Sequence, residues 1–171
     1  MPRRLDYSAR YPLHTTKEVY AALMNRDLWD ARIEEMRKYS PNDIISLDSG
    51  DSGITVTLRH VLPRESLPEM AQAVMRKDMI ITRRETYGPF GPEVTGEYTA
   101  EIPGGPGTLG GTMRLFPTET GCTLRTSSHA EVHIPFFGRK LEQVMLVNLI
   151  DLFRAEAEVT KTWLDQQNPV G

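Results

Sequence analysis

The chain has 171 residues, of which 39% are apolar and 25% charged, and this balance excludes a disordered or membrane-spanning protein. The net charge of −3 disfavours a general nucleic-acid-binding protein, and the single cysteine, Cys122, excludes an internal disulfide and a cysteine-rich metal site. No signal peptide or apolar run of transmembrane length is present, so we expect a cytoplasmic protein with no integral membrane segment.

The N-terminal part of the chain has first the apolar period of a strand and then that of helices. Leu5–Tyr11 places apolar residues at every second position, which predicts a strand. Thr15 and Glu18 have the spacing of a capping box, so a short helix is predicted to begin there and to end at Asn25. A second helix is predicted over Asp27–Lys38.

The apolar period then becomes two, which is typical of strands joined by short turns. Strands are predicted at Ile44–Asp48, Ile54–Arg59, Asp78–Tyr87, Glu93–Ile102, Thr108–Phe116 and Cys122–Ile134, before one long helix over Gly138–Gln166. Short connections between consecutive strands indicate an antiparallel sheet. The predicted class is therefore α+β, with about seven antiparallel strands curved around the C-terminal helix and two short helices between the first and second strands.

Five short motifs occur in chain order across most of the sequence. They are Tyr7-Ser8-Ala9, Pro63 with Pro68, Tyr87-Gly88-Pro89, Ile134-Pro135 with Glu142, and Glu156 with Trp163-Leu164. The ordered set resembles an uncharacterised actinobacterial family of the START/Bet v 1-like (SRPBCC) superfamily. The resemblance implies one helix-grip domain over residues 1–171, with a cavity between sheet and helix that often holds an apolar ligand. It implies no catalytic residue, and we expect no cofactor.

Glu156 is predicted to lie within the apolar stripe of the long helix. The stripe is formed by Met145, Leu149, Leu152, Val159 and Trp163. An ionised carboxylate there is costly unless it is paired or hydrated. Glu156 is therefore either a polar anchor at the inner end of a ligand cavity or a structural partner for an arginine, a tyrosine or a backbone N–H.

Small residues recur on the predicted inner faces of three neighbouring strands. Ser128 lies between Thr126 and Ala130, and Gly96 and Gly111 lie in the middle of their strands. This pattern favours a hollow interior. The alternatives are that Tyr98, Phe136, Phe137 and Trp163 fill the space, or that the glycines mark bulges.

Two further polar residues are predicted to face inward. His60 continues the inner face of its strand and is either a partner for a ligand or for Glu156, or a satisfied histidine at the strand's end. Arg83 faces inward if the more apolar side of its strand does, and is then a natural partner for Glu156; the alternative is a pair with Glu85 near the rim of the sheet. His129, Glu131 and His133 share a solvent-facing strand surface, so no metal site is expected there.

These residues predict a module that binds a hydrophobic small molecule, lipid-like or aromatic. The apolar wall is predicted from Val56, Leu58, Tyr98, Met113, Met145, Leu149 and Leu152, with Glu156 and His60, Arg83 or Ser128 orienting the ligand. Entry is expected past the loops 63–70 and 88–92. One alternative is a cyclase or dehydratase that uses Glu156, His60 or Tyr98 as acid or base. Another is an interaction protein with a collapsed cavity.

Overall fold

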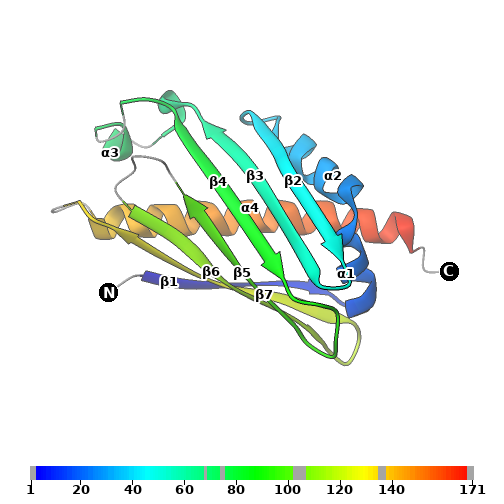
Figure 1. The fold of residues 1–171 in the computed structure, drawn as a ribbon. Coiled ribbons are helices and arrows are strands. Elements are labelled where there is room, and N and C mark those ends of the chain that lie inside the picture. Colours follow the sequence, from blue (N-terminus) through cyan, green and yellow to red (C-terminus); the bar gives the residue numbers. More distant parts are fainter. Residues whose placement is uncertain (1–2, 68, 74–75, 102–106, 135–137, 169–171) are drawn as a thin grey trace.

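The protein is an antiparallel sheet curled around one long helix, in a computed structural model that describes residues 3–67, 69–73, 76–101, 107–134 and 138–168. The strands are β1 (Arg3–Tyr11), β2 (Asn42–Gly50), β3 (Gly53–Leu62), β4 (Met79–Tyr87), β5 (Val94–Glu101), β6 (Gly107–Pro117) and β7 (Cys122–Val132). The helices are α1 (Thr16–Met24), α2 (Arg26–Met36), α3 (Glu69–Gln72) and α4 (Gly138–Gln167), with a 3-10 turn at Arg64–Ser66. The sheet order is β1-β7-β6-β5-β4-β3-β2, and every neighbouring pair is antiparallel (Figure 1). The predicted fold class is confirmed.

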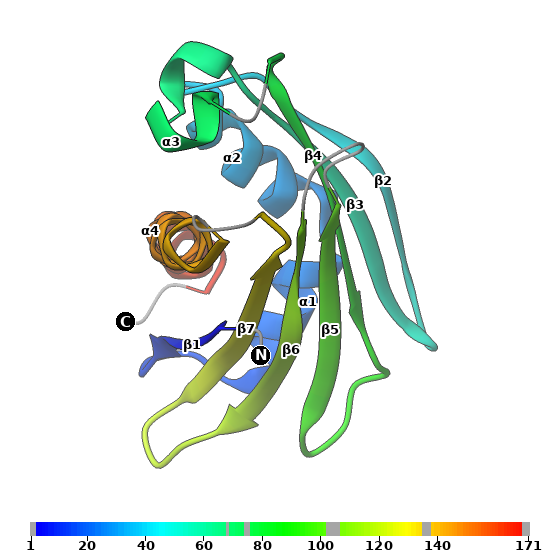
Figure 2. The same ribbon diagram turned by 90° about the vertical axis from the view of Figure 1, so that its left-hand side faces the viewer.

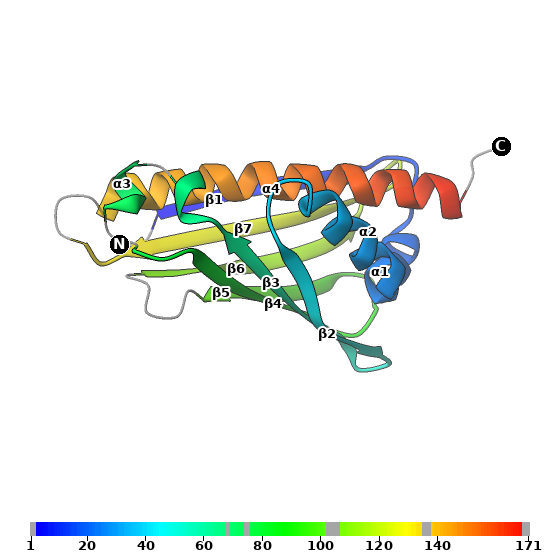
Figure 3. The ribbon, with the colours of Figure 1, turned by 90° about the horizontal axis from the view of Figure 1, so that it is seen from above.

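Helix α4 lies along the concave face of the sheet, and the strands bend around it when viewed along the helix axis (Figure 2). With 30 residues it is about 45 Å long, which lets it span the whole sheet. The chain crosses from edge strand β1 to edge strand β2 through α1 and α2. These two helices lie near the C-terminal end of α4, whereas α3 lies near its N-terminal end (Figure 3).

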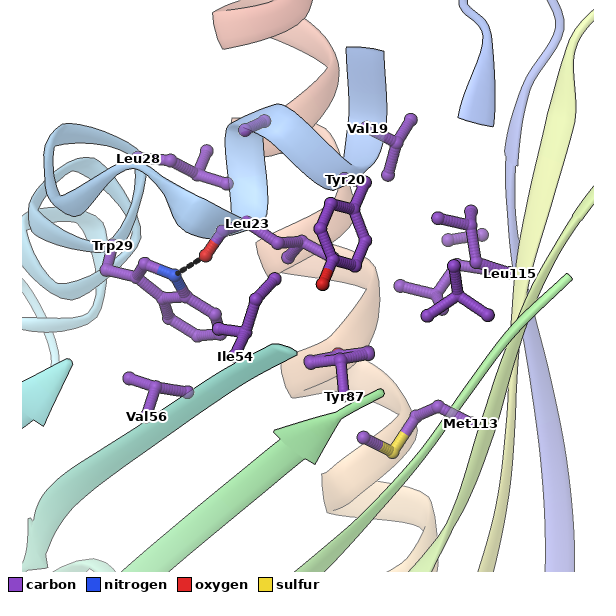
Figure 4. Packing of buried hydrophobic residues seen from close by; sticks show 14 of the residues in the cluster. Val19, Tyr20, Leu23, Leu28, Trp29, Ile54, Val56, Tyr87, Met113 and Leu115 are labelled. Carbon is purple, nitrogen blue, oxygen red and sulfur yellow. Dashed lines mark hydrogen bonds between the residues drawn. The ribbon is translucent and has the colours of Figure 1, made fainter. Parts of the chain in front are cut away.

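The two short helices begin and end where their capping residues predict. Thr15 and Glu18 form the capping box, because each side chain accepts a hydrogen bond from the other residue's backbone N–H at 3.1 Å. Asn25 ends α1 and caps α2 by accepting from the Asp27 backbone N–H at 2.9 Å. The buried Trp29 indole donates to the Leu23 carbonyl at 2.8 Å, which holds the two helices together over the sheet (Figure 4).

The inner faces of the strands agree with the alternation in the sequence. On β7 the buried set includes Leu124, Thr126, Ser128 and Ala130, and on β4 Arg83, Glu85 and Tyr87 all face inward. Strand β2 extends beyond Ile44–Asp48 because its backbone pairing with β3 continues past the alternating apolar residues, interrupted only by a register shift between Ile44 and Ser46.

The inner stripe of α4 is rotated from the one that apolar periodicity predicts. Leu149 and Glu156 are buried as expected, but Met145, Leu152, Val159 and Trp163 are only half-buried. The other buried positions are Gly138, Leu141, Glu142, Leu146, Thr160 and Leu164. The prediction missed the rotation because the helix packs on a partly polar interior, so a glutamate and a threonine mark its inner side as much as leucines do.

The glycines on the inner face do not leave an open hollow. A Cβ atom at Gly96 would lie 3.0 Å from the Tyr87 ring, and a Cβ atom at Gly111 would lie 2.8 Å from the Tyr98 ring. Both tyrosines are buried. The expectation of a hollow is therefore wrong at these two positions, because tyrosine rings occupy the space that the glycines provide.

Some residues named in the sequence analysis lie outside the described residues. They are Pro68, the segment 102–106 at the end of β5, and Pro135, Phe136 and Phe137 before α4.

Replacing Gly111 with alanine should destabilise the fold, because the new Cβ would meet the Ser127 carbonyl oxygen at 2.2 Å as well as the Tyr98 ring. We expect a loss of about 1–3 kcal/mol in the free energy of unfolding, typical of overpacking. Gly50→Ala is the matched control, since no atom lies within 4 Å of its Cβ position. Urea unfolding followed by circular dichroism measures both, and equal stabilities would contradict the packing described.

Candidate functional site

A small cavity lies between the concave face of the sheet and α4. Its volume is about 30 Å³, which is room for about two water molecules. The wall consists of aromatic, apolar and charged side chains from five strands, α2 and α4: Tyr7, Ala9, Tyr11, Arg32, Glu85, Tyr87, Tyr98, Met113, Leu124, Thr126, Phe153, Glu156 and Ala157. Tyr87 and Met113 come from neighbouring parts of the inner face (Figure 4). The site thus combines an apolar surface with buried charge.

A buried ion pair joins the sheet to α4 beside this cavity. Nη2 of Arg83 lies 2.5 Å from Oε2 of Glu156, and the two residues are 1% and 5% exposed. Nε of Arg83 also lies 3.3 Å from Oε2 of Glu85. The predicted Arg83–Glu156 pairing is confirmed. The alternative pair with Glu85 is present as well, but it is buried rather than at the rim.

The pair fixes the charge state of both partners. Burial acts to lower the pKa of Arg83, but the carboxylates of Glu156 and Glu85 together outweigh it and the pKa is raised. Burial acts to raise the pKa of Glu156, but the guanidinium groups of Arg83 and then Arg32 hold it below its usual value. Glu156 is therefore a carboxylate and Arg83 a cation at neutral pH.

His60 is buried near the same pair, but it bonds neither Glu156 nor Arg83. Its Nδ1 hydrogen-bonds to Oδ1 of Asn42, whose amide nitrogen donates to the Ser40 carbonyl at 2.7 Å. That orientation of Asn42 requires the proton to be on Nδ1, so Nε2 carries a lone pair, and it has no hydrogen-bond partner among the described residues. Burial, followed by the charge of Arg83, lowers the pKa of His60 to about 4, so the ring is neutral.

Arg32 is a second buried arginine, which the sequence analysis missed. Its Nε donates to Oγ1 of Thr160 at 2.9 Å, and its guanidinium carbon lies 4.7 Å from the centre of the Trp29 ring. The hydroxyl of Thr160 in turn donates to the Glu156 carbonyl at 2.7 Å. Arg32 lies three residues after Trp29 on the inner side of α2, and that helical spacing was the signal that could have identified it.

Two tyrosine hydroxyls complete the polar part of the site. Oη of Tyr98 and Oγ of Ser128 lie 2.5 Å apart in a hydrogen bond, and Tyr87 donates to Glu85 at 2.8 Å. Burial raises the pKa of Tyr98 to about 12, and burial followed by the charge of Glu85 raises the pKa of Tyr87 as well. Both side chains are therefore neutral phenols at physiological pH.

The predicted site residues divide into those on the cavity wall and those behind it. Tyr98, Met113 and Glu156 line the cavity. Arg83 and Ser128 are not on the wall, but they hydrogen-bond to the wall residues Glu156 and Tyr98. His60 is not on the wall either, and it hydrogen-bonds to Asn42. Val56, Leu58 and Leu149 belong to the main hydrophobic cluster, Leu152 packs against it, and Met145 packs against a second cluster of Leu67, Val132 and Leu141.

The two loops expected to border the entrance lie at opposite ends of the sheet. Leu62 at the end of β3 pairs with Met79 at the start of β4, so the connection between them lies at one end. Tyr87 at the other end of β4 leads into residues 88–92, where the Tyr20 hydroxyl donates to the Gly88 carbonyl at 2.8 Å and its ring lies 5.4 Å from Phe90. The two loops therefore cannot border a single opening.

Metal and thiol chemistry find no support in the described part of the chain. No group of three or more His, Cys, Asp or Glu side chains in it is placed to hold a metal ion. Burial raises the pKa of Cys122 to about 11, so it remains a thiol. None of the helices described is long and apolar enough to span a membrane.

Known proteins resemble this chain in sequence and in fold. Residues 6–164 match the family described as "Protein of unknown function (DUF2505)". "Uncharacterized protein Rv0481c" of Mycobacterium tuberculosis (strain ATCC 25618 / H37Rv) is 32% identical over 175 residues, covering 96% of this chain and 98% of that protein. Among solved structures, the Bet v 1 allergen Ara h 8.0201 has a TM-score of 0.60 at 10% identity, covering 95% of this chain and 99% of that one. The protein TTHA0849 from Thermus thermophilus has a TM-score of 0.58 at 16% identity, with 94% and 97% covered.

Replacing Glu156 with glutamine should strongly destabilise the protein, because it leaves the charge of Arg83 buried with only the longer contact to Glu85. Removing one partner of a buried pair costs about 3–5 kcal/mol, and we expect a loss of that size in urea unfolding. Asp151→Asn is the control on the same helix. It removes the exposed pair with Arg154 and should leave stability unchanged within error. Similar losses in both variants would contradict a special role for the buried pair.

Stability should fall on mild acidification because of His60. Its folded pKa of about 4 lies below the ordinary value of 6.5, so between these pH values the unfolded chain binds a proton that the folded chain does not. The groups that act on it are Arg83 and Glu156, with Asn42 bonded to its ring. From pH 7 to pH 5 its contribution to the free energy of unfolding should decrease by about 2 kcal/mol.

Urea unfolding of wild type and His60→Gln at both pH values isolates this contribution, because the titration of Glu156 lies lower. On going from pH 7 to pH 5, the free energy of unfolding should decrease less in the variant than in the wild type. An identical pH dependence would show that His60 is not buried in its neutral form.

Proposed function

The chain belongs to the DUF2505 family and has a Bet v 1-like fold, and on this basis we propose that it binds a hydrophobic small molecule, lipid-like or aromatic, between the sheet and α4. The observation that carries the proposal is the cavity between these two elements, with aromatic and apolar side chains on its wall and buried charge at its inner side. The START/Bet v 1-like (SRPBCC) superfamily is the wider group to which we assign it, supported by the similar folds.

Three aromatic side chains provide the surface for such a ligand. Phe153 of α4 lies 5.8 Å from Tyr98, with the rings at 88° to each other, and 6.3 Å from Tyr7. Both tyrosines come from the sheet, so Phe153 bridges the space between the two layers. Burying apolar area against such a wall contributes about 25 cal/mol per Å², and this would be the main source of affinity.

The cavity must widen when a ligand binds, because its volume of about 30 Å³ is far below the roughly 300–1,000 Å³ of sites for drug-sized molecules. Phe153 is the side chain whose movement opens it most directly. It is half-buried, and its ring is held by packing contacts, which include those with Tyr7 and Tyr98. A ligand ring that takes its place would keep the aromatic contacts with Tyr7 and Tyr98.

Binding is favoured over turnover by the state of the candidate acids and bases. Acid–base catalysis works best with a pKa near the operating pH. Here the pKa of Tyr98 is about 12, that of His60 is about 4, and Glu156 is held as a carboxylate by Arg83. These groups suit the orientation of a ligand better than the proton transfers of a cyclase or dehydratase.

Phe153→Ala tests the proposal, because it vacates the place that the ligand is expected to take. We expect the variant to bind the uncharged dye N-phenyl-1-naphthylamine about tenfold more tightly than the wild type, measured by fluorescence titration. Val147→Ala, at an exposed position of the same helix, is the control and should bind like the wild type. Absence of dye binding in both the wild type and Phe153→Ala, or a weaker affinity in Phe153→Ala, would contradict the proposal.

A further inference from the structure

The charges that surround the cavity cancel one another. Glu85 and Glu156 lie on the wall with Arg32, and Arg83 lies directly behind them, so two carboxylates face two guanidinium groups. His60 adds no charge, because burial keeps its ring neutral. A ligand that brought a further charge into this site would leave it unbalanced in a poorly hydrated interior, which is costly.

The charges cancel, but several N–H donors of the two arginines have no hydrogen-bond acceptor. Arg83 directs Nη2 to Glu156. Its Nη1 has no hydrogen-bond partner among the described residues, and its Nε has only the ion-pair contact with Glu85 at 3.3 Å. Arg32 uses Nε for Thr160, and its terminal nitrogens form no hydrogen bond and no ion pair within the described chain, although the side chain is 6% exposed and lines the cavity. The site therefore holds arginine N–H donors that lack a hydrogen-bond acceptor.

An arginine such as Arg32 ordinarily prefers a carboxylate, because two N–H groups of its planar guanidinium can bind the two carboxylate oxygens side by side. In this cavity a bound carboxylate would lie among the carboxylates of Glu85 and Glu156, and like charges repel strongly where the effective dielectric constant is low. Arg32 also already interacts with Glu156, because its positive charge helps to lower the pKa of the Glu156 carboxyl. An uncharged acceptor satisfies the donors without this repulsion.

Resting on the proposed function, we infer that the ligand carries an uncharged hydrogen-bond acceptor, a carbonyl oxygen of a ketone, ester or amide, which Arg32 binds at the inner end of the cavity. The apolar part of the ligand then lies toward Phe153 and Tyr7. The site accordingly discriminates against a carboxylate on the same carbon skeleton.

Three naphthalenes of similar size test the inference at pH 7 by displacement of N-phenyl-1-naphthylamine. They are 2-acetylnaphthalene, which has an uncharged carbonyl, 2-naphthoate, which is an anion, and 2-ethylnaphthalene, which has no acceptor. We expect 2-acetylnaphthalene to bind the wild type at least about tenfold more tightly than either of the others. In Arg32→Met its advantage over 2-ethylnaphthalene should shrink to about twofold or less. In Arg26→Met, an exposed arginine of the same helix, the advantage should be unchanged.

The outcomes separate the two proposals. If 2-naphthoate binds as tightly as 2-acetylnaphthalene, or if 2-ethylnaphthalene does, the inference is wrong while the proposed function stands. If none of the three binds and the dye does not bind, both are wrong. Should Arg32→Met fail to fold by circular dichroism, the ranking of the three ligands on the wild type decides the inference by itself.

Discussion

The ion pair between Arg83 and Glu156 is the interaction on which the arrangement of this protein depends. It connects the middle of β4 to the middle of α4, two elements that are 73 positions apart in the chain, through a contact of 2.5 Å that is almost fully buried. Taking both charges out of water is expensive, so the pair is stable only with further polar partners around it. Glu85 contacts Arg83 directly, the charge of Arg32 acts on Glu156, and Tyr87 and Thr160 hydrogen-bond to Glu85 and Arg32, respectively.

Polar contacts along α4 determine how this helix is oriented against the sheet. Along the helix, Glu142 accepts from the Val132 backbone N–H at 2.9 Å, Glu156 bonds Arg83, Thr160 bonds Arg32, and Asp165 bonds the buried His14 at 2.8 Å. These directional contacts lie near both ends and in the middle, so they fix the rotation of α4 about its axis. Apolar packing alone is non-directional and would tolerate other rotations. The apolar residues of α4 then fill the gaps between the polar contacts.

Much of the architecture could be predicted from the sequence, because it depends on the spacing of residues that are close together in the chain. The capping box at Thr15, the alternation along β4 and β7, and the charged residue inside an apolar stripe at Glu156 each follow from spacing. The pairing of Arg83 with Glu156 followed from asking which buried cation could neutralise that carboxylate.

The parts that could not be predicted depend on three-dimensional packing. Whether Gly96 and Gly111 leave a hollow depends on where the rings of Tyr87 and Tyr98 lie, and spacing does not contain that information. Arg32 reaches the cavity from a helix that is distant in sequence from α4, so only the folded chain shows it beside Glu156. The size of the cavity likewise depends on side-chain conformations such as that of Phe153.

The most direct test of a ligand site between the sheet and α4 is to locate a bound ligand by NMR. The measurement records isotope-filtered nuclear Overhauser effects between 13C-labelled protein and unlabelled N-phenyl-1-naphthylamine. The account predicts contacts from the dye to Tyr7, Tyr98 and Phe153. Contacts confined to exposed apolar side chains outside the cavity, such as Tyr39 and Phe90, would contradict it.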